Sequence, residues 1–313
     1  MLARLQACLV LAALVAASAW SAWAWQRGLP LWAGLAGLLL TLAPHAPVLA
    51  LEFLLLALLG RDPQAPRAST RQLIRAWAGE VLTGLRVFGW RQPFGAGRQA
   101  DVPGRPGRAG VLLVHGLVCN RGLWSPWLVQ LWRAGVPCIA LSLEPAFGRI
   151  ETWLPAIDAA VLRLQRETGR PPLLVGHSMG GLVLRAWLAA QTDAAAADAR
   201  VLGLITVGTP HHGTWMARWG LSSNARQMRL GSPWLGALAA RESAARRARF
   251  TCFYGHADNI VFPAGSATLA GADNRHLAGV AHVQMLFEAP VLAEVLRRVA
   301  PDRPAAAPAA FTS

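Results

Sequence analysis

The chain has 313 residues, of which 54% are hydrophobic and 15% charged, a composition more apolar than that of an ordinary soluble domain. Its net charge is +14, and all 30 basic residues are arginine. The arginines are scattered and no nucleic-acid-binding signature occurs, so we expect no nucleic-acid partner, whereas anionic lipid headgroups suit this charge. The four cysteines are widely spaced and match no metal-binding pattern.

Two apolar segments fill the first 60 residues, where Arg27 and Glu52 are the only charged residues between positions 5 and 59. Residues 5–25 are apolar for roughly the 20 residues that a membrane helix needs, with three tryptophans at their far end. Residues 29–59 are long enough to cross with a kink at Pro44 and Pro47. The pattern predicts a transmembrane helical hairpin over 1–60. A secretory signal peptide is the alternative for the first segment.

The distribution of arginines predicts the side of the membrane on which the rest of the chain lies. Residues 61–110 hold nine arginines against three acids, whereas the turn between the apolar segments holds only Arg27. By the positive-inside rule we expect a protein of the bacterial inner membrane with its large domain in the cytoplasm. If the N-terminus is a signal peptide and the second segment does not cross, the domain is instead periplasmic or secreted.

Residues 61–107 read as a basic linker that contains one amphipathic helix. From 70 to 88, apolar side chains recur at steps of three or four residues, at Leu73, Trp77, Val81, Leu85 and Phe88. Two placements fit this apolar face equally well: the membrane surface, or the surface of the domain that follows.

Residues 108–300 alternate between short apolar runs and amphipathic helices, which is typical of a mostly parallel sheet flanked by helices. The predicted strands are 111–114, 137–143, 173–176, 201–207 and 250–254, and the predicted helices are 123–134, 152–168, 179–191 and 290–299. The residues from 301 to 313 are rich in alanine and proline and read as a disordered tail.

A nucleophile motif follows the third predicted strand. Residues 176–180 read Gly-His-Ser-Met-Gly between a buried strand and a helix, which is the context that the GxSxG elbow requires. Small residues on both flanks allow a sharp turn that lifts the hydroxyl of Ser178 above the sheet. We therefore predict Ser178 as a nucleophile.

A serine hydroxyl is a weak nucleophile until a base removes its proton, so a histidine and an orienting acid must accompany it. In this type of fold the order along the chain is serine, acid, histidine. Asp258 follows the predicted strand 250–254 directly, and His282 precedes the last helix. We predict these two residues as acid and base, with Asp273, in an expected turn, as the rival acid.

The oxyanion formed by attack on an ester needs two hydrogen-bond donors. The first predicted donor is the backbone N–H of Met179, directly after the nucleophile. The second is the backbone N–H of Leu117, in the loop that follows the first strand, where the chain reads His115-Gly116-Leu117. We expect His115, Gly116 and His177 to line the same site.

Together these motifs resemble those of bacterial lipases and esterases of the α/β-hydrolase superfamily. The similar segments are VLLVHGL (111–117), VGHSMGG (175–181), VGTPHHGT (207–214), HADNIVFP (256–263) and GVAHVQML (279–286). The resemblance implies an α/β-hydrolase fold and activity on acyl or lipid esters without an organic cofactor. The secreted lipases that the chain resembles often hold calcium, but no calcium loop is recognisable here, so we expect no metal site. The resemblance also implies that His211 and His212 line the site and that His282 is the catalytic histidine.

Residues 214–249 belong to no predicted sheet unit and are rich in tryptophan, leucine and arginine. In the family that this chain resembles, an insertion at this point forms a helical cap or lid, and a plain pair of surface helices is the alternative.

We therefore predict a membrane-anchored serine hydrolase of carboxylic esters, in the carboxylesterase and lipase class. Acyl transfer or thioester cleavage would use the same three residues and remains an alternative. A membrane-anchored binding module without catalysis is the alternative from another functional class.

Overall fold

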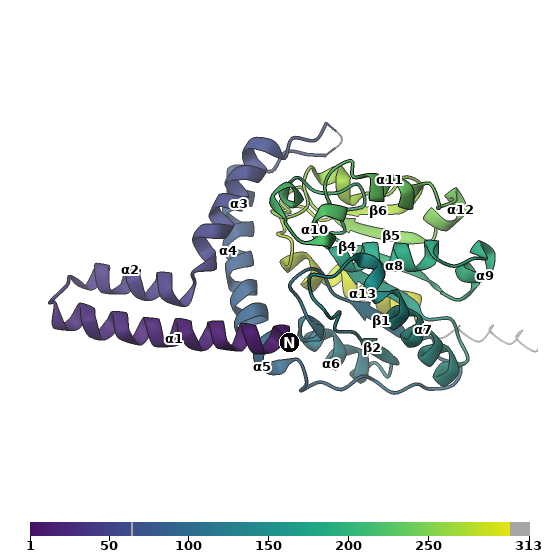
Figure 1. Ribbon diagram of the computed structural model, residues 1–313, viewed down its shortest axis with the longest axis horizontal. Coiled ribbons are helices and arrows are strands. Elements are labelled where there is room, and N and C mark those ends of the chain that lie inside the picture. The colour runs from purple at the N-terminus through teal and green to yellow at the C-terminus, as the bar shows by residue number, and fades with distance from the viewer. Residues whose placement is uncertain (64, 301–313) are drawn as a thin grey trace, which may run out of the picture.

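The computed structural model describes residues 1–63 and 65–300, so the predicted tail from 301 lies outside the described residues. Six strands form one sheet in the order β2-β1-β3-β4-β5-β6, and every neighbouring pair is parallel (Figure 1). The strands are β1 Val111–Val114, β2 Cys138–Ala140, β3 Leu173–His177, β4 Gly203–Val207, β5 Phe250–Tyr254 and β6 Asp273–His276. The predicted parallel sheet is confirmed.

Helices cover both faces of the sheet, because alternate side chains of its strands are apolar on both sides. Leu112 and Leu174 pack with helices α7 (Leu154–Thr168) and α8 (Met179–Ala189). Leu113 and Val175 point the other way and pack with α6 (Ser125–Arg133) and α13 (Ala289–Arg298). The central strands are thus fully buried between two layers of helices.

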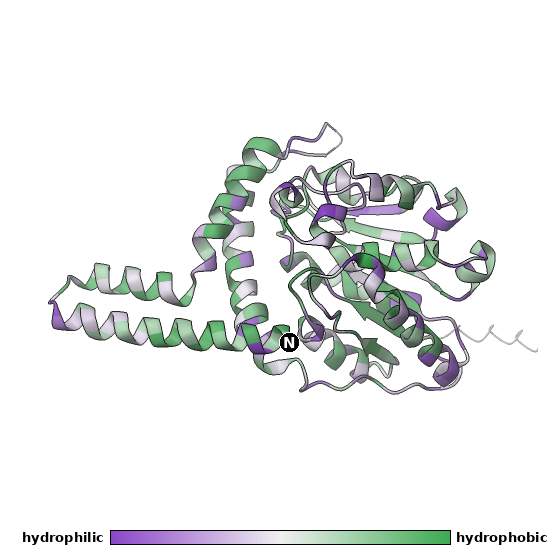
Figure 2. Ribbon diagram, viewed as in Figure 1, coloured by the Kyte–Doolittle hydropathy of each residue, from purple (hydrophilic) through white to green (hydrophobic). Residues whose placement is uncertain are grey.

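Strand β6 is the one element of the sheet that the hydrophobic pattern does not predict. Its sequence, Asp-Asn-Arg-His, is hydrophilic, and it is the purple strand of Figure 2. As an edge strand it pairs only with β5, so its side chains reach water and need not be apolar.

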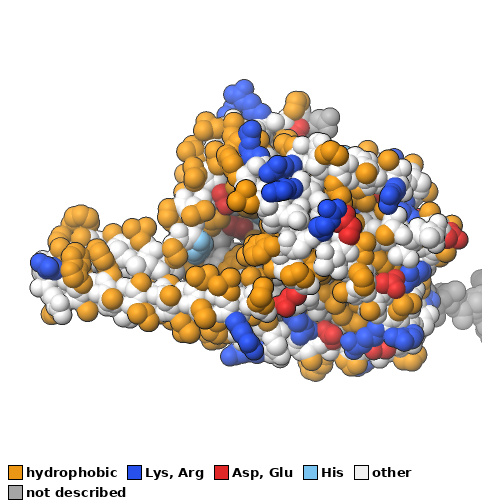
Figure 3. All heavy atoms as spheres, in the orientation of Figure 1, with side chains coloured by type: hydrophobic (Ala, Val, Ile, Leu, Met, Phe, Trp, Pro, Cys, Tyr) orange, Lys and Arg blue, Asp and Glu red, His pale blue; other side chains and the backbone are white. Residues whose placement is uncertain are grey.

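The N-terminal segment forms three helices: α1 Leu2–Gln26, α2 Leu31–Leu42 and α3 His45–Leu59. The first is long and apolar enough to cross a membrane, whereas α2 and α3 meet at a bend of 77°. Helices α1 and α2 lie side by side and project from the domain, and exposed apolar side chains cover them (Figures 1 and 3). The bend falls at Pro44, one of the positions at which the sequence predicts a kink, and it divides the second apolar segment into two helices.

Helix α3 lies against α4 (Thr70–Arg86) and the domain that contains the sheet (Figure 1). A capping box begins α4, in which the Ser69 side chain accepts from the Gln72 backbone and the Gln72 side chain accepts from the Ser69 backbone. The buried face of α4 carries Ala76, Glu80, Thr83 and Gly84, so this helix packs on the domain instead of lying free. Short helical turns follow, η1 (Val87–Arg91) and α5 (Gln92–Gly95).

Four short helices lie between β4 and β5, in the segment for which we expected a cap. They are η4 Trp215–Trp219, α10 Ser223–Gln227, α11 Pro233–Ala239 and α12 Ala244–Arg247. Met228, Leu235 and Leu238 bury this segment against the face that carries α8, while Trp219 and Leu221 stay exposed. The remaining turns are η2 Arg121–Trp124, η3 Ile150–Trp153, α9 Ala194–Ala199, η5 Ala264–Ala267 and η6 Gln284–Phe287.

Candidate active site

Ser178 is the single residue between β3 and α8, and its backbone has φ 54° and ψ −128°. A non-glycine residue at positive φ carries strain on the order of 1–3 kcal/mol, which is typical of functional turns. The turn is tight on both flanks. A Cβ at Gly176 would lie 2.5 Å from the nitrogen of Gly181, and one at Gly180 would lie 2.2 Å from the carbonyl oxygen of Val114. Only glycine fits at these two positions, as the motif predicts.

Asp258 and His282 are joined in the structure, although 24 residues separate them. Asp258 Oδ2 lies 2.9 Å from His282 Nδ1, and both side chains are almost fully buried. The other oxygen, Oδ1, accepts from the backbone N–H groups of Ile260 and Val261 at 2.9 and 2.8 Å. A carboxylate held in this way keeps the proton of neutral His282 on Nδ1 and leaves Nε2 free to accept a proton.

Burial alone would lower the pKa of His282, but the charges of nearby carboxylates outweigh it and raise that pKa above its usual value. Asp258 contributes most, through charge and through its hydrogen bond, and Glu80 and Glu52 add to it. The imidazolium form of His282 is therefore stabilised, which is what a base needs when it takes up a proton.

The contacts around the elbow bring Ser178 to the same place as this pair. The ring of His177, its neighbour in the chain, lies 4.9 Å from the ring of His282, centroid to centroid. Gly208 follows β4, and a Cβ there would lie 3.0 Å from His282 Nδ1 and 3.1 Å from Asp258 Oδ2. The next residue, Thr209, donates its hydroxyl to the carbonyl oxygen of Ser178 at 2.8 Å. Ser178 and the Asp258–His282 pair are thus linked through the residues at the carboxyl ends of β3 and β4.

The predicted oxyanion loop adjoins the serine. A Cβ at Gly116 would lie 2.8 Å from Ser178 Cβ and 3.3 Å from Ser178 Oγ. His115 is buried, with Nε2 accepting from the Leu143 N–H at 2.9 Å and Nδ1 donating to the Gly116 carbonyl at 2.8 Å. Because the carbonyl and the next N–H of a trans peptide point in opposite directions, the Leu117 N–H points away from His115. Burial lowers the pKa of His115 to about 4, so this ring stays neutral.

The other expected donor and the other predicted site-lining histidine lie at the elbow. Met179 is the first residue of α8, whose N-terminal N–H groups carry partial positive charge. His177 is buried, and its Nε2 donates to the carbonyl oxygen of His282 at 3.3 Å. Burial lowers the pKa of His177 well below its usual value, so a neutral ring packs on the base.

His211 and His212, which we also expected to line the site, make polar contacts with α8, β4 and the loop that carries Ser266. His211 is buried between Thr206, whose hydroxyl lies 3.0 Å from its Nε2, and Arg185, whose Nη1 lies 3.2 Å from its Nδ1. Arg185 forms a buried two-bond ion pair with Glu242. The backbone N–H of His212 donates to the carbonyl oxygen of Ser266 at 3.0 Å. These contacts tie β4 and the loop after it to α8, to Glu242 before β5 and to Ser266 after β5, and none of them reaches Ser178 or His282.

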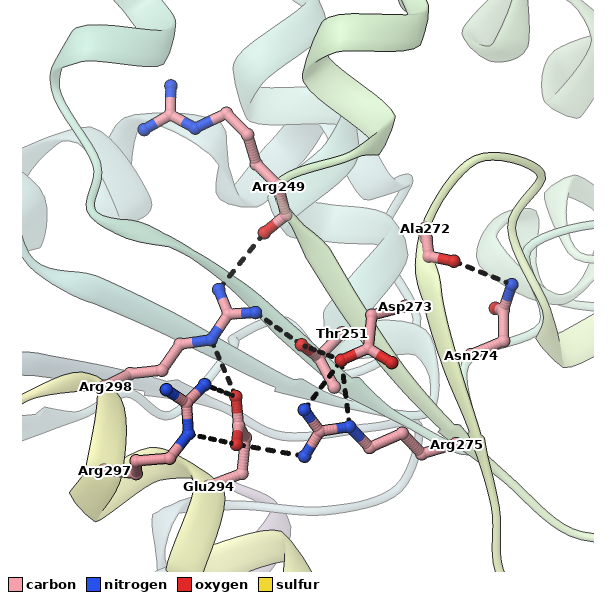
Figure 4. A network of polar contacts seen from close by, with 9 residues as sticks. All are labelled: Arg249, Thr251, Ala272, Asp273, Asn274, Arg275, Glu294, Arg297 and Arg298. Atoms are coloured by element: carbon pink, nitrogen blue, oxygen red, sulfur yellow. Dashed lines mark hydrogen bonds and ion pairs between the residues drawn. The ribbon is translucent and has the colours of Figure 1, made fainter.

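The rival acid, Asp273, lies on the edge strand β6 and not in a turn. Figure 4 shows its carboxylate facing Arg275 and Thr251, next to the group of arginines that surrounds Glu294 on α13. Its ion pair with Arg275 at 2.7 Å is about half exposed. Asp273 therefore belongs to a polar network on the outer side of the sheet, away from His282.

Three polar residues next to the site were not among the predicted site residues: Asn259, which lies within the segment 256–263, and Glu52 and Glu80, which lie outside every motif. The Asn259 side chain accepts from the backbone N–H of His282 at 3.3 Å and donates to Glu52 Oε2 at 2.7 Å. Glu80 accepts from the backbone N–H groups of the two residues after His282. A different signal in the sequence marks each glutamate. Glu52 is the only acid between positions 5 and 59, and Glu80 lies one heptad after Leu73, on the packing side of its helix.

No metal site accompanies this arrangement in the part of the chain that the structure describes, where no group of three or more His, Cys, Asp or Glu side chains could hold an ion.

Comparison with known proteins shows the family and the fold. Residues 111–311, more than half of the chain, match the model of the alpha/beta hydrolase family. None of the curated protein sequences matches. Among solved structures, the mature form of the Bacillus licheniformis lipase BlEst2 is similar to this chain, with a TM-score of 0.53 and 18% identity over 63% of this chain and 94% of that one. Its propeptide form gives a TM-score of 0.54 and 18% identity over 67% and 56%. At this identity the likeness is one of fold, and the family match carries the conclusion: the chain belongs to the alpha/beta hydrolase family.

Proposed function

We propose that this protein is a serine hydrolase that cleaves carboxylic esters, with Ser178 as nucleophile, His282 as base and Asp258 as orienting acid. The hydrogen bond between Asp258 and His282, beside a strained serine elbow, is the observation that carries the proposal. Ser178 Oγ bonds to the ester carbonyl carbon while His282 Nε2 takes the hydroxyl proton, and the carbonyl oxygen becomes an oxyanion. The backbone N–H groups of Met179 and Leu117 donate to that oxyanion.

The second half of the reaction repeats the first with water. The carbon–oxygen bond to the alcohol breaks, the leaving oxygen takes the proton from His282, and the acyl group remains on Ser178. Water then attacks this acyl-enzyme while His282 takes its proton, and the proton returns to Ser178 Oγ as the acid leaves. Each proton transfer uses Nε2, which requires that Asp258 keep the other proton on Nδ1.

Exposed apolar side chains on the loops after β1 and β2 and on the segment 214–249 favour an acyl chain as the acid part of the substrate. Val118, which follows the oxyanion loop, is partly exposed, as is Phe147 on the loop after β2. Asn224 on α10 donates to the carbonyl oxygen of Ala146, which joins that loop to the segment bearing the exposed Trp219. Exposed apolar side chains of this kind suit an ester with a hydrocarbon chain, in keeping with the lipase that the chain resembles in fold.

The test is hydrolysis of p-nitrophenyl esters of rising acyl length by the purified wild-type protein and by Ser178→Ala. The variant removes one oxygen and should keep the melting temperature within a few degrees while turnover falls to the level of the uncatalysed reaction. Turnover at the wild-type rate in the variant would remove Ser178 from the mechanism. Transfer of the acyl group to an alcohol or cleavage of a thioester, measured beside hydrolysis, identifies the alternative reactions of the same three residues.

We further propose that helices α1 and α2 anchor the protein in a bilayer, with the hydrolase domain on the cytoplasmic side of a bacterial inner membrane. Exposed leucines, valines and tryptophans cover both helices, and these helices carry no acidic side chain. Helix α2 has 12 residues and rises roughly 18 Å, which is shorter than the hydrocarbon core of about 30 Å. Helix α2 alone is therefore too short to cross. We propose that α1 and α2 enter the bilayer together as a hairpin, from the side on which the domain lies, while α3 stays packed on the domain.

A reporter fused after residue 313 tests the orientation. The nine arginines between 61 and 110 oppose translocation, so a fluorescent-protein fusion should fluoresce and an alkaline phosphatase fusion should be inactive. Active alkaline phosphatase would place the domain outside the cytoplasm. Recovery of the wild-type protein in the soluble fraction after carbonate extraction would contradict the anchor itself.

A further inference from the structure

Glu80 bonds directly to the loop that carries the base. It lies in the middle of α4 with 3% of its surface exposed. Its Oε1 accepts from the backbone N–H of Val283 at 2.8 Å, and its Oε2 accepts from that of Gln284 at 2.9 Å. A carboxylate that accepts two successive N–H groups fixes the backbone directly after His282.

A second carboxylate reaches the same loop through one intermediate. Glu52, on α3, accepts from the Asn259 side chain at 2.7 Å, and the oxygen of that amide accepts from the backbone N–H of His282 at 3.3 Å. Asn259 directly follows Asp258, so this short chain of bonds links the acid's loop to the base's loop and ties both to α3.

Apolar packing joins the same four segments. Phe53 and Leu56 from α3 and Ala76 from α4 form one buried cluster with residues beside the acid and the base, namely Ala257, Phe262 and Ala281. Helices α3 and α4 lie before residue 111, where the match to the family begins. Two helices from outside the family's own domain therefore hold the loops that bear Asp258 and His282.

We propose that Glu80 is a positioning residue for His282, assisted by Glu52, so that the N-terminal helices complete the catalytic unit as well as anchoring it. This inference rests on the proposed serine-hydrolase function. Glu80 keeps the His282 ring where Nδ1 meets Asp258 and Nε2 faces the serine elbow. In their ionised forms both glutamates also place negative charge near the imidazolium that forms when His282 takes a proton, and burial raises the pKa of Glu80 to about 7.

Four charged or titratable side chains face His282, each from a different element of the fold. Asp258 follows β5, Glu80 is on α4, Glu52 is on α3, and His177 ends β3 and stays neutral. The charges of all three carboxylates raise the pKa of His282. Removal of Glu80 or Glu52 should therefore lower that pKa, which a residue that only supports the fold would not do.

The test compares Glu80→Gln with Glu294→Gln in the full-length protein, both as purified in detergent. Glu294 is the matched control, because it is an equally buried acid whose partners, Arg275, Arg297 and Arg298, do not belong to the loop that bears His282 (Figure 4). In Glu80→Gln the amide nitrogen faces one of the two N–H groups, so one bond is lost and the loop shifts. We expect kcat to fall about tenfold to a hundredfold with KM nearly unchanged, since small misplacement of a catalytic group has that effect.

The pH dependence of kcat/KM separates positioning from general support. In Glu80→Gln the acid limb should move to lower pH, whereas Glu294→Gln should keep both the limb and the kcat per folded molecule of the wild type, whatever its melting temperature. Glu52→Gln retains an oxygen that accepts from Asn259 but loses the charge, so it should move the limb in the same direction with little change in kcat. This second variant decides the matter if Glu80→Gln does not fold.

Two results would overturn the inference. One is Glu80→Gln with kcat within threefold of the wild type; the other is an acid limb that stays in place in both Glu80→Gln and Glu52→Gln. Failure of the proposed function looks different, because the wild-type protein would then show no hydrolysis that depends on Ser178. Wild-type activity that Ser178→Ala abolishes, combined with unaffected glutamate variants, refutes the inference alone.

Discussion

Replacement of Asp258 by asparagine tests the acid with almost no change of shape. Oδ1 accepts from the backbone N–H groups of Ile260 and Val261 at 2.9 and 2.8 Å. In Asp258→Asn only the amide oxygen suits that position, so the NH₂ group must take the place of Oδ2, 2.9 Å from His282 Nδ1. An NH₂ donor there forces Nδ1 to accept and moves the ring proton to Nε2. The ring then presents a donor to Ser178 and cannot take its proton.

The expected loss of turnover is therefore large, roughly 10⁴-fold as in serine proteases with the same change, or about 5 kcal/mol in the barrier. Asp273→Asn is the matched control, because it makes the same substitution in a half-exposed ion pair worth at most about 1 kcal/mol of stability. Steady-state hydrolysis of a p-nitrophenyl ester measures both variants, with melting curves to compare folded fractions. Asp258→Asn within tenfold of the wild type, or greater damage from Asp273→Asn, would refute the assignment of the acid.

Three further predictions concern stability and geometry. Gly208→Ala adds a Cβ 3.0 Å from His282 Nδ1 at a residue with φ 56°, so kcat should fall at least tenfold, measured by ester hydrolysis, while KM changes little. Arg185→Met leaves Glu242 buried without its partner and should lower the free energy of unfolding by about 3–5 kcal/mol in a denaturant titration, whereas replacing both residues by apolar ones should cost less. Burial raises the pKa of Glu80 to about 7 from 4.5, so its ionisation opposes folding. The contribution of Glu80 to stability should fall by about 3 kcal/mol as the pH rises through that window, and Glu80→Gln should lose this part of the pH dependence in melting curves.

The sequence predicts the central sheet well because its strands are buried on both faces and read as continuous apolar runs. The predicted strand 111–114 and the predicted strand 250–254 match β1 and β5. The serine elbow is equally legible, since tight packing permits only glycine at its flanks. The juxtaposition of Asp258 and His282 follows from the order of the strands, because loops after neighbouring parallel strands meet at one edge of the sheet.

Other features depend on contacts between distant segments, which a pattern along the chain does not contain. Strand β6 is polar because an edge strand faces water, and no periodicity marks it. The apolar residues of α3 fit a membrane span and a packed helix equally well, and burial of Phe53 and Leu56 on the domain distinguishes the two. His211 lies in a segment that resembles the family's motif, but its ring contacts Arg185, which in turn forms an ion pair with Glu242.

Site-mapped labelling by a fluorophosphonate tests the central claim most directly, because the probe reacts only with a serine that a base has activated. The proposed mechanism predicts one adduct per chain, on the peptide that contains Ser178, and slower labelling when His282 is replaced by alanine. An unlabelled protein that is folded by melting analysis, or an adduct on any other serine, would contradict the mechanism.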